Sequence, residues 1–301
     1  MTANGTEPEA LRLEADGQVL TGILRRAPEG GRSTLVVALH GGTYTSRYFE
    51  VAAPGGYGFL AQAAAKGFPA VAIDRPGYGG SAAIPPTENT FARHAALLGE
   101  AIASLVVELD ASGVFLVGHS IGGMIGLDVA GGAGDFRLLG ASLTGMGAVM
   151  RADGPARAMG EAALGSELEV IDLPNELRDP VMFGPDWTYT PELLAAGRLA
   201  YAPAPVSELA EPPRWPGEHL EEVASAVTVP VQYVVGEFDA IWDSSAAAIG
   251  SFVDALGAAP LVDSGVARAT GHSIDHHILG PALHARQLAF AEECELLATR
   301  G

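Results

Sequence analysis

Hydrophobic and polar positions follow two kinds of pattern along the chain. Short, nearly continuous apolar runs, of which residues 33–39 are the clearest, are typical of strands buried on both faces of a sheet. Longer stretches such as residues 91–109 place apolar side chains three or four positions apart, which indicates helices. Strands are expected over residues 11–14, 18–25, 33–39, 69–73, 114–117, 138–143, 229–235 and 260–267.

The order of these elements predicts the fold class. Asp16 and Gly17 lie between two short alternating runs, which signals a hairpin near the start of the chain. After it, strands alternate with helices expected over residues 58–66, 91–109, 246–256 and 283–297, and directly after residue 120. Because such alternation favours parallel strands covered by helices, we expect an α/β fold with a mostly parallel eight-stranded sheet and helices on both faces.

Residues 150–222 interrupt this alternation, so we expect them to be an insertion in a core domain made of residues 1–149 and 223–301. The segment is rich in proline and has weak strand character. Its large aromatic residues include Phe183, Trp187, Tyr189, Tyr201 and Trp215. Because ligands of such sheets bind at the carboxyl ends of the strands, we expect a lid there, with at least two of these aromatic side chains facing the ligand. The alternative is a purely structural segment.

Composition and charge disfavour several classes of partner. The chain of 301 residues has a formal net charge of −19, and such an acidic surface repels nucleic-acid phosphates and anionic membranes. No apolar run is long enough to span a membrane and no secretory signal pattern is visible, so we expect a cytoplasmic protein. Cys294 is the only cysteine, which excludes an intrachain disulfide. The oligomeric state does not follow from the sequence.

The sequence Gly118-His119-Ser120-Ile121-Gly122 stands between an expected strand and an expected helix. That is the context of a nucleophile elbow, in which a serine at the apex of a tight turn is raised out of the sheet. Glycines fit two positions before and after it, because strand and helix approach too closely for side chains. The backbone N–H of Ile121 would point to where an oxyanion forms. We therefore interpret Ser120 as a candidate nucleophile.

A serine hydroxyl is a poor nucleophile and needs a general base within hydrogen-bond reach. His272 follows the last expected strand and Gly271, where it can overhang the elbow, and is the favoured candidate. His276 and His277 are competitors for this role; otherwise we expect them to be a solvated or helix-capping pair. Together with Asp275 they suggest a metal cluster, but no further ligand set is evident, so no metal is expected.

The protonated base in turn needs a carboxylate that holds its tautomer and stabilises its charge. Asp239 stands near the end of the strand expected over residues 229–235 and is the favoured candidate. Glu237 and Asp243 lie nearby and are the alternatives, although both positions are more typical of solvated carboxylates.

Taken together, these motifs resemble those of the α/β-hydrolase superfamily over nearly the whole chain outside the insertion. The family pattern has a strand ending in His-Gly, a loop similar to Asp-x-Pro-Gly-x-Gly-x-Ser, the serine elbow, an acid after a later strand and a histidine near the C-terminus. In this chain they stand as His40-Gly41-Gly42, residues 74–81, residues 118–122, Asp239 and His272. Their order along the chain is the one expected of this fold.

The resemblance implies further site residues. Gly42 would supply the second oxyanion donor beside Ile121, with Thr43 as the runner-up. His40 is expected to brace this loop, and His119 to pack against its neighbours near the substrate. The residues assigned to substrate contacts are Thr43, His119, Phe183, Trp187 and Tyr189.

The function implied is that of a serine hydrolase that cleaves a carboxylic ester, thioester or lactone of a hydrophobic small molecule through an acyl-enzyme, without a cofactor or metal. Two other readings stay open. One is a non-hydrolytic enzyme on the same scaffold, such as an acyltransferase, cyclase or lyase. The other is a catalytically silent binding protein, against which Ser120, Asp239 and His272 argue. A dehalogenase or epoxide hydrolase would carry aspartate in place of Ser120.

Overall fold

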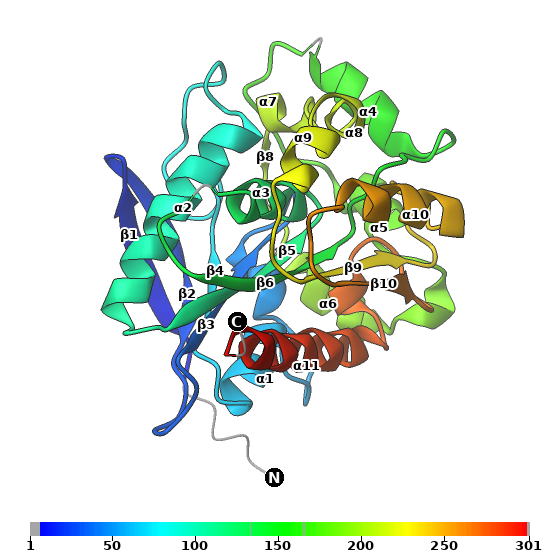
Figure 1. The fold of residues 1–301 in the computed structure, drawn as a ribbon. Helices are drawn as coiled ribbons and strands as arrows, with labels where there is room; N and C mark the ends of the chain where they lie inside the picture. The colour runs from blue at the N-terminus through cyan, green and yellow to red at the C-terminus, as the bar shows by residue number, and fades with distance from the viewer. Residues whose placement is uncertain (1–6, 133, 165, 300–301) are drawn as a thin grey trace.

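A single eight-stranded sheet forms the centre of the computed structural model, which describes residues 7–132, 134–164 and 166–299 (Figure 1). Its strands are β1 (Glu9–Ala15), β2 (Gln18–Arg25), β3 (Thr34–Leu39), β4 (Ala70–Ile73), β5 (Gly113–His119), β6 (Leu138–Thr144), β9 (Val231–Gly236) and β10 (Val262–Ala267). They follow the order β1-β2-β4-β3-β5-β6-β9-β10. The pairs of β2 with β1 and with β4 are antiparallel and all the other pairs are parallel, which confirms the expected, mostly parallel sheet.

The middle strands are buried on both faces, as their continuous apolar runs predict. Every residue of β3 and β5 is buried. The two strands are parallel, with Leu39 opposite Gly118, so they end side by side at the same edge of the sheet. The loops that follow them, which carry Gly42 and Ser120, are therefore brought together there.

Helices cover both faces of the sheet (Figure 1). α1 (Phe59–Ala65) and α11 (Gly280–Ala298) lie together on one face. The other face carries α2 (Phe91–Glu108), α3 (Ile121–Ala130) and α10 (Ala246–Ala255). Within the described part of the chain, no helix combines the length and apolar character needed to cross a membrane.

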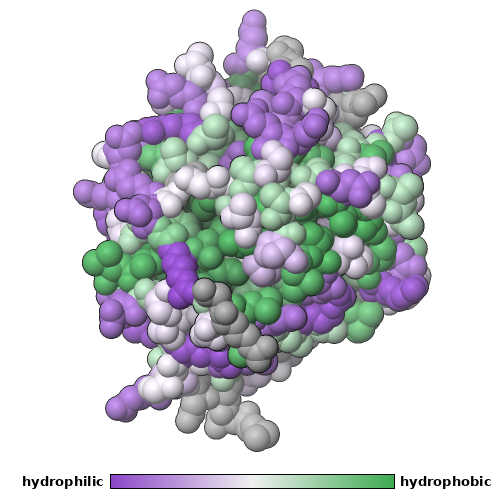
Figure 2. All heavy atoms as spheres, viewed as in Figure 1, coloured by the Kyte–Doolittle hydropathy of each residue, from purple (hydrophilic) through white to green (hydrophobic). Residues whose placement is uncertain are grey.

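Residues 150–222 fold outside the sheet as short helices joined by loops. The helices are α4 (Pro155–Leu164), α5 (Asn175–Met182), α6 (Pro191–Arg198), α7 (Val206–Leu209), α8 (Trp215–Glu218) and α9 (Leu220–Ser225). The short strands β7 (Val170–Ile171) and β8 (Ala204–Pro205) pair antiparallel. This second sheet is not predictable from the sequence, because two residues are too few for an alternating pattern. Figure 2 shows hydrophilic residues gathered toward the top of the view, where α4, α7 and α8 lie.

A buried ion pair joins this segment to the loop after β4. Arg75 Nη1 and Nη2 donate to the two carboxylate oxygens of Glu208 on α7, over 2.6 and 3.0 Å. The hydroxyl of Tyr78 donates to the same carboxylate over 2.8 Å. The backbone N–H of Arg75 also donates to His40 Nε2 over 3.1 Å, so His40 braces the β3 loop as expected. α7 is thereby fixed beside the loop that carries Gly42.

Candidate active site

Ser120 occupies the sharp turn between β5 and α3. Its backbone has φ 55° and ψ −124°, a conformation that side-chain-bearing residues rarely adopt. A Cβ on Gly118 would stand 2.6 Å from the Cα of Gly123, and one on Gly122 would stand 2.2 Å from the carbonyl oxygen of Leu39. Both flanking positions therefore require glycine, for the packing reason that the sequence indicates.

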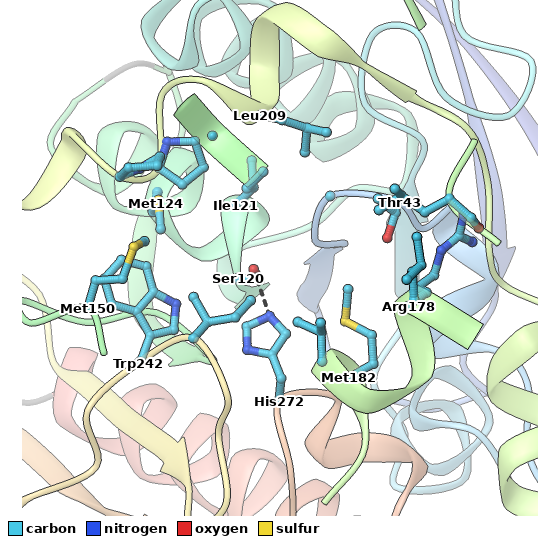
Figure 3. A pocket seen from close by; sticks show the side chains of 18 residues that line it. Thr43, Ser120, Ile121, Met124, Met150, Arg178, Met182, Leu209, Trp242 and His272 are labelled. Atoms are coloured by element: carbon cyan, nitrogen blue, oxygen red, sulfur yellow. Dashed lines mark hydrogen bonds between the residues drawn. The ribbon is translucent and has the colours of Figure 1, made fainter. Parts of the chain in front are cut away.

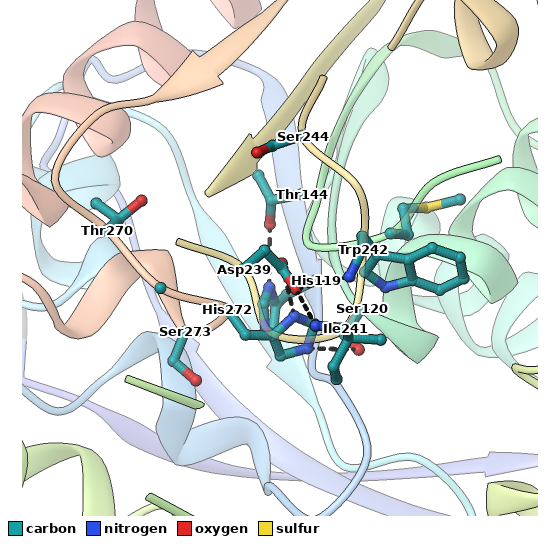
Figure 4. A network of polar contacts seen from close by, with 12 residues as sticks. His119, Ser120, Thr144, Asp239, Ile241, Trp242, Ser244, Thr270, His272 and Ser273 are labelled. Atoms are coloured by element: carbon teal, nitrogen blue, oxygen red, sulfur yellow. Dashed lines mark hydrogen bonds and ion pairs between the residues drawn. The ribbon is translucent and has the colours of Figure 1, made fainter. Parts of the chain in front are cut away.

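A chain of hydrogen bonds runs from Ser120 through His272 to Asp239 (Figure 4). The Ser120 hydroxyl donates to His272 Nε2 over 3.0 Å, and His272 Nδ1–H donates to Asp239 Oδ2 over 2.9 Å. The other oxygen of Asp239 accepts from the backbone N–H groups of Ile241 and Trp242, over 2.8 and 2.9 Å. This is the geometry in which an imidazole can take a proton from a serine.

The electrostatics keep Asp239 ionised although it is buried. Burial alone would raise the pKa of this carboxyl. The charge and hydrogen bond of His272, together with the N–H groups of Trp242 and Ile241, outweigh burial and hold the pKa below its ordinary value. The carboxylate can therefore stabilise an imidazolium at position 272.

The alternative acids make other contacts. Glu237 is exposed, and one of its carboxylate oxygens accepts from the backbone N–H of Ala269 over 2.8 Å. Asp243 accepts from the backbone N–H of Ser245 over 2.8 Å. The sequence-based choice of Asp239 thus corresponds to the carboxylate that contacts His272.

His276 and His277 are both buried, so the expectation of a solvated or capping pair is wrong. His277 Nδ1–H donates to the carbonyl of Ser273, and Nε2 accepts from the N–H groups of Gly184 and Gly271 over 3.1 and 3.0 Å. Both ring nitrogens of His277 are therefore hydrogen-bonded, and they link the loop that carries His272 to the segment 150–222. Consecutive polar residues in a loop are typical of an exposed segment, and the sequence does not show that backbone groups of other segments will bury them and bind them.

His119 lies beneath the site rather than in it. Its ring stacks on Tyr48 with centroids 4.6 Å apart, and its centroid is 5.0 Å from that of His272. Burial, with the neighbouring His272, lowers the pKa of His119 to about 3, so this ring is neutral at physiological pH. The expected packing role agrees with these contacts, whereas the assignment to substrate contact is wrong, because the side chain lies behind the hydrogen-bonded chain.

The two expected oxyanion donors lie next to each other. A Cβ on Gly42 would stand 2.9 Å from Ile121 Cδ1, and one on Gly41 would stand 3.0 Å from Ser120 Cβ. The loop backbone thus approaches the elbow as closely as glycine allows. The backbone N–H of Thr43, the runner-up, points to the hydroxyl of Tyr78 at 3.4 Å. Gly42 remains the better candidate for the second donor.

Ser120 and His272 open into a cavity (Figure 3). The core contributes Gly42, Thr43, Ile121, Met124, Ile241 and Trp242 to its wall. Segment 150–222 contributes Met150, Gly160, Leu173, Leu177, Arg178, Val181, Met182, Leu209, Pro212 and Pro213. The wall is therefore mainly aliphatic, and much of it comes from the insertion.

The aromatic residues assigned to substrate contact lie elsewhere. Phe183 and Tyr189 pack against one another and against His277. Trp187 is 60% exposed and packs edge-on against Phe238. Tyr201 packs on Tyr44, and Trp215 is buried in the main hydrophobic core. The assignments of Phe183, Trp187 and Tyr189 are wrong because the aromatic rings seal the contacts of the insertion, while flexible aliphatic side chains line the cavity.

Residues 36–289 match the family described as the alpha/beta hydrolase family. The chain belongs to the alpha/beta hydrolase family. No curated protein matches it. The match spans the elbow, both flanking loops and the segment 150–222, and so covers every residue of the site described above.

Solved structures share the fold of this alpha/beta hydrolase. A thermophilic esterase from Thermogutta terrifontis is 18% identical, with a TM-score of 0.68 over 95% of this chain and 99% of that one. The enol-lactonase from Burkholderia xenovorans LB400 is 17% identical, with a TM-score of 0.66 over 94% and 100%. A thioesterase domain from the curacin biosynthetic pathway is 16% identical, with a TM-score of 0.64 over 94% and 100%. At these identities the likeness establishes the fold alone.

Proposed function

We propose that this protein is a serine hydrolase that cleaves a carboxylic ester, thioester or lactone of a hydrophobic small molecule through an acyl-enzyme on Ser120. The observation that carries the proposal is the hydrogen-bonded chain Ser120–His272–Asp239, which opens into an apolar cavity beside two backbone N–H groups. A silent binding protein would have no need of the strained backbone at Ser120.

In the first half of the reaction, Ser120 Oγ attacks the carbonyl carbon as His272 Nε2 takes the hydroxyl proton. The carbonyl oxygen becomes an oxyanion, which the backbone N–H groups of Gly42 and Ile121 stabilise. Asp239 holds the His272 ring in place and stabilises its positive charge. His272 then gives its proton to the departing alcohol or thiol, and the acyl group remains on Ser120.

In the second half, a water molecule gives a proton to His272 Nε2 and attacks the acyl carbon. The oxyanion forms again beside Gly42 and Ile121, and its collapse breaks the bond to Ser120 Oγ. His272 returns the proton to that oxygen, which releases the carboxylic acid and restores the enzyme. Every proton passes through His272, and no metal or cofactor takes part.

We also propose that segment 150–222 acts as the lid of this cavity. Its side chains supply the aliphatic wall over Ser120, and Glu208 fixes α7 to the core through Arg75. An apolar wall binds hydrophobic acyl or alcohol groups more favourably than polar ones, because their burial releases water from apolar surface. We therefore expect a preference for hydrophobic substrates over small polar esters.

Turnover of 4-nitrophenyl esters of graded acyl length tests the proposal. We expect release of nitrophenol and of one carboxylic acid per ester, with kcat/KM rising with acyl length until the cavity is filled. Transfer of the acyl group to an added alcohol without acid release would instead favour an acyltransferase. Absence of turnover across esters, thioesters and lactones would overturn the proposed function.

A further inference from the structure

One wall of the cavity carries polar atoms that no protein group satisfies. Arg178, on α5, and Thr43, after β3, both line the cavity and are only 2% and 3% exposed. Among the described residues, Nε of Arg178 and Oγ1 of Thr43 are buried without a hydrogen-bond partner. Burying an unsatisfied polar group is unfavourable, so two in one wall call for an explanation.

The guanidinium of Arg178 is held rigidly by its other contacts. Its Nη2 donates to the carbonyl of Leu173 over 2.7 Å and to Asp172 over 3.0 Å. Its plane lies over the ring of Tyr201, with 4.3 Å between the guanidinium carbon and the ring centroid. Tyr201 in turn donates to Asp179 over 2.9 Å. The orientation of Nε is therefore fixed before any ligand arrives.

Thr43 is brought to the same side of the cavity by the backbone. Tyr44 forms a β-bridge with Tyr201, and the N–H of Ala202 donates to the carbonyl of Thr43 over 2.9 Å. Since Arg178 stacks on that same Tyr201, both unsatisfied groups flank one short stretch of chain. Figure 3 shows Thr43 and Arg178 together on one side, Met150 and Trp242 on the other, and Ser120 between them.

The charge of the cavity favours an acceptor of negative charge. Among the lining residues that the structure describes, Arg178 is the only one with a permanent positive charge, and none is a carboxylate. The carboxylate of Asp172, which pairs with Arg178, is 73% exposed and lies outside the cavity. Nε–H and a threonine hydroxyl are two donors, which match the two oxygens of a carboxylate.

We propose that Arg178 and Thr43 form a subsite for a carboxylate on the substrate, so that the ester cleaved at Ser120 is apolar in its middle and anionic at its far end. Arg178 Nε donates to one oxygen and Thr43 Oγ1 to the other. This subsite rests on the proposed function for its substrate, since it names the class of ester that the same cavity accepts. It assigns Arg178 and Thr43 to specificity and gives neither a part in bond breaking.

Binding to the Ser120→Ala variant tests the subsite without any turnover. Monoethyl esters of linear dicarboxylic acids are compared by calorimetry with ethyl esters of monocarboxylic acids of the same chain length. At the best-fitting length we expect the carboxylate form to bind about ten- to a hundredfold more tightly, the range for hydrogen bonds to a charged group. Adding Thr43→Val, which removes only the hydroxyl function, or Arg178→Met should bring this ratio close to one.

Arg214→Met is the matched control, because Arg214 lies in the same segment, pairs with Glu218 and does not line the cavity. It should leave the ratio unchanged. Equal binding of both ester series, or an equal loss for both in the Thr43→Val variant, would overturn the subsite. Turnover of the neutral esters by the unmutated protein reports separately on the proposed function, so a failure of one is distinguished from a failure of the other.

Discussion

Asp239 is a buried residue whose negative charge is stabilised by a few hydrogen-bond donors. His272 and two backbone N–H groups lower the pKa of this carboxyl despite burial. In Asp239→Asn the side chain carries no charge and presents an N–H₂ donor to His272 in one of its two orientations. We expect kcat/KM on 4-nitrophenyl esters to fall about 10³- to 10⁴-fold, because the wrong imidazole tautomer is favoured.

Glu237→Gln is the control for that substitution. The carboxylate of Glu237 is exposed and contacts the backbone of Ala269, so its loss should change kcat/KM by no more than about threefold. Equal losses in the two variants would show that Asp239 has been given the wrong role.

At the same scale, some residues can be read from the sequence and others cannot. Ser120, Asp239 and His272 follow strand ends in a fixed chain order, which makes their meeting predictable. Arg178 has no such signal. It stands in a helix of mixed polarity, and the sequence does not reveal the contacts with Tyr201 and with the carbonyl of Leu173 that orient it.

At the scale of elements, the packing of α3 against β3 is set by glycine. A Cβ on Gly122 would overlap the carbonyl oxygen of Leu39, whereas one on Gly126, a turn later, would have its nearest neighbour at 3.8 Å. We expect Gly122→Ala to lower the free energy of unfolding by about 3 kcal/mol or more. Gly126→Ala should leave it unchanged or raise it by up to about 1 kcal/mol, since alanine favours helix.

Urea denaturation of the two variants measures this difference. Both positions lie in the same helix, so the loss of glycine flexibility is similar in the two variants. A difference between them therefore reports on the close approach of α3 to β3. If Gly122→Ala were as stable as Gly126→Ala, the close approach of α3 to β3 at Gly122 would be wrong.

The elements also differ in how far the sequence predicts them. Continuous apolar runs such as β3 and β5 are predictable, because a strand buried on both faces is apolar along most of its length. The helices of residues 150–222 are short, and several contain proline or begin at one, so their boundaries depend on tertiary contacts. The aromatic residues there predict burial. An aromatic ring packs equally well between two elements and in a cavity wall, and the sequence does not distinguish these two places.

At the scale of the whole molecule, two carboxyls at the junction of core and insertion make stability depend on pH. Burial, chiefly, raises the pKa of Glu211 from 4.5 to about 7 and that of Asp128 from 3.8 to about 6. Between the unfolded and folded values the folded protein binds more protons than the unfolded chain. The contribution of these two carboxyls to the free energy of unfolding is therefore lost as the pH rises from about 4 to about 7.

Glu211→Gln tests this linkage, because an amide oxygen can still accept from the N–H of Phe91, as the carboxylate does. Relative to the unmutated protein, we expect the variant to gain stability between pH 5 and pH 8, because only the unmutated protein loses the contribution of Glu211. The difference at pH 8 should be about 1 kcal/mol, since the carboxyl is partly solvated. Thermal unfolding at several pH values measures it, with the exposed Glu221→Gln as control. A variant as pH-dependent as the unmutated protein would contradict the assignment.

Covalent labelling tests the central claim, that Ser120 is the nucleophile, most directly. The protein is treated with an alkyl fluorophosphonate, and the modified peptide is located by mass spectrometry in the unmutated chain and in Ser120→Ala, with circular dichroism to verify folding. We expect one phosphonate per chain, on Ser120, none in Ser120→Ala, and greatly slowed labelling in His272→Ala, since serine and histidine act as a unit. Labelling at another residue, or labelling that persists in folded Ser120→Ala, would contradict the account.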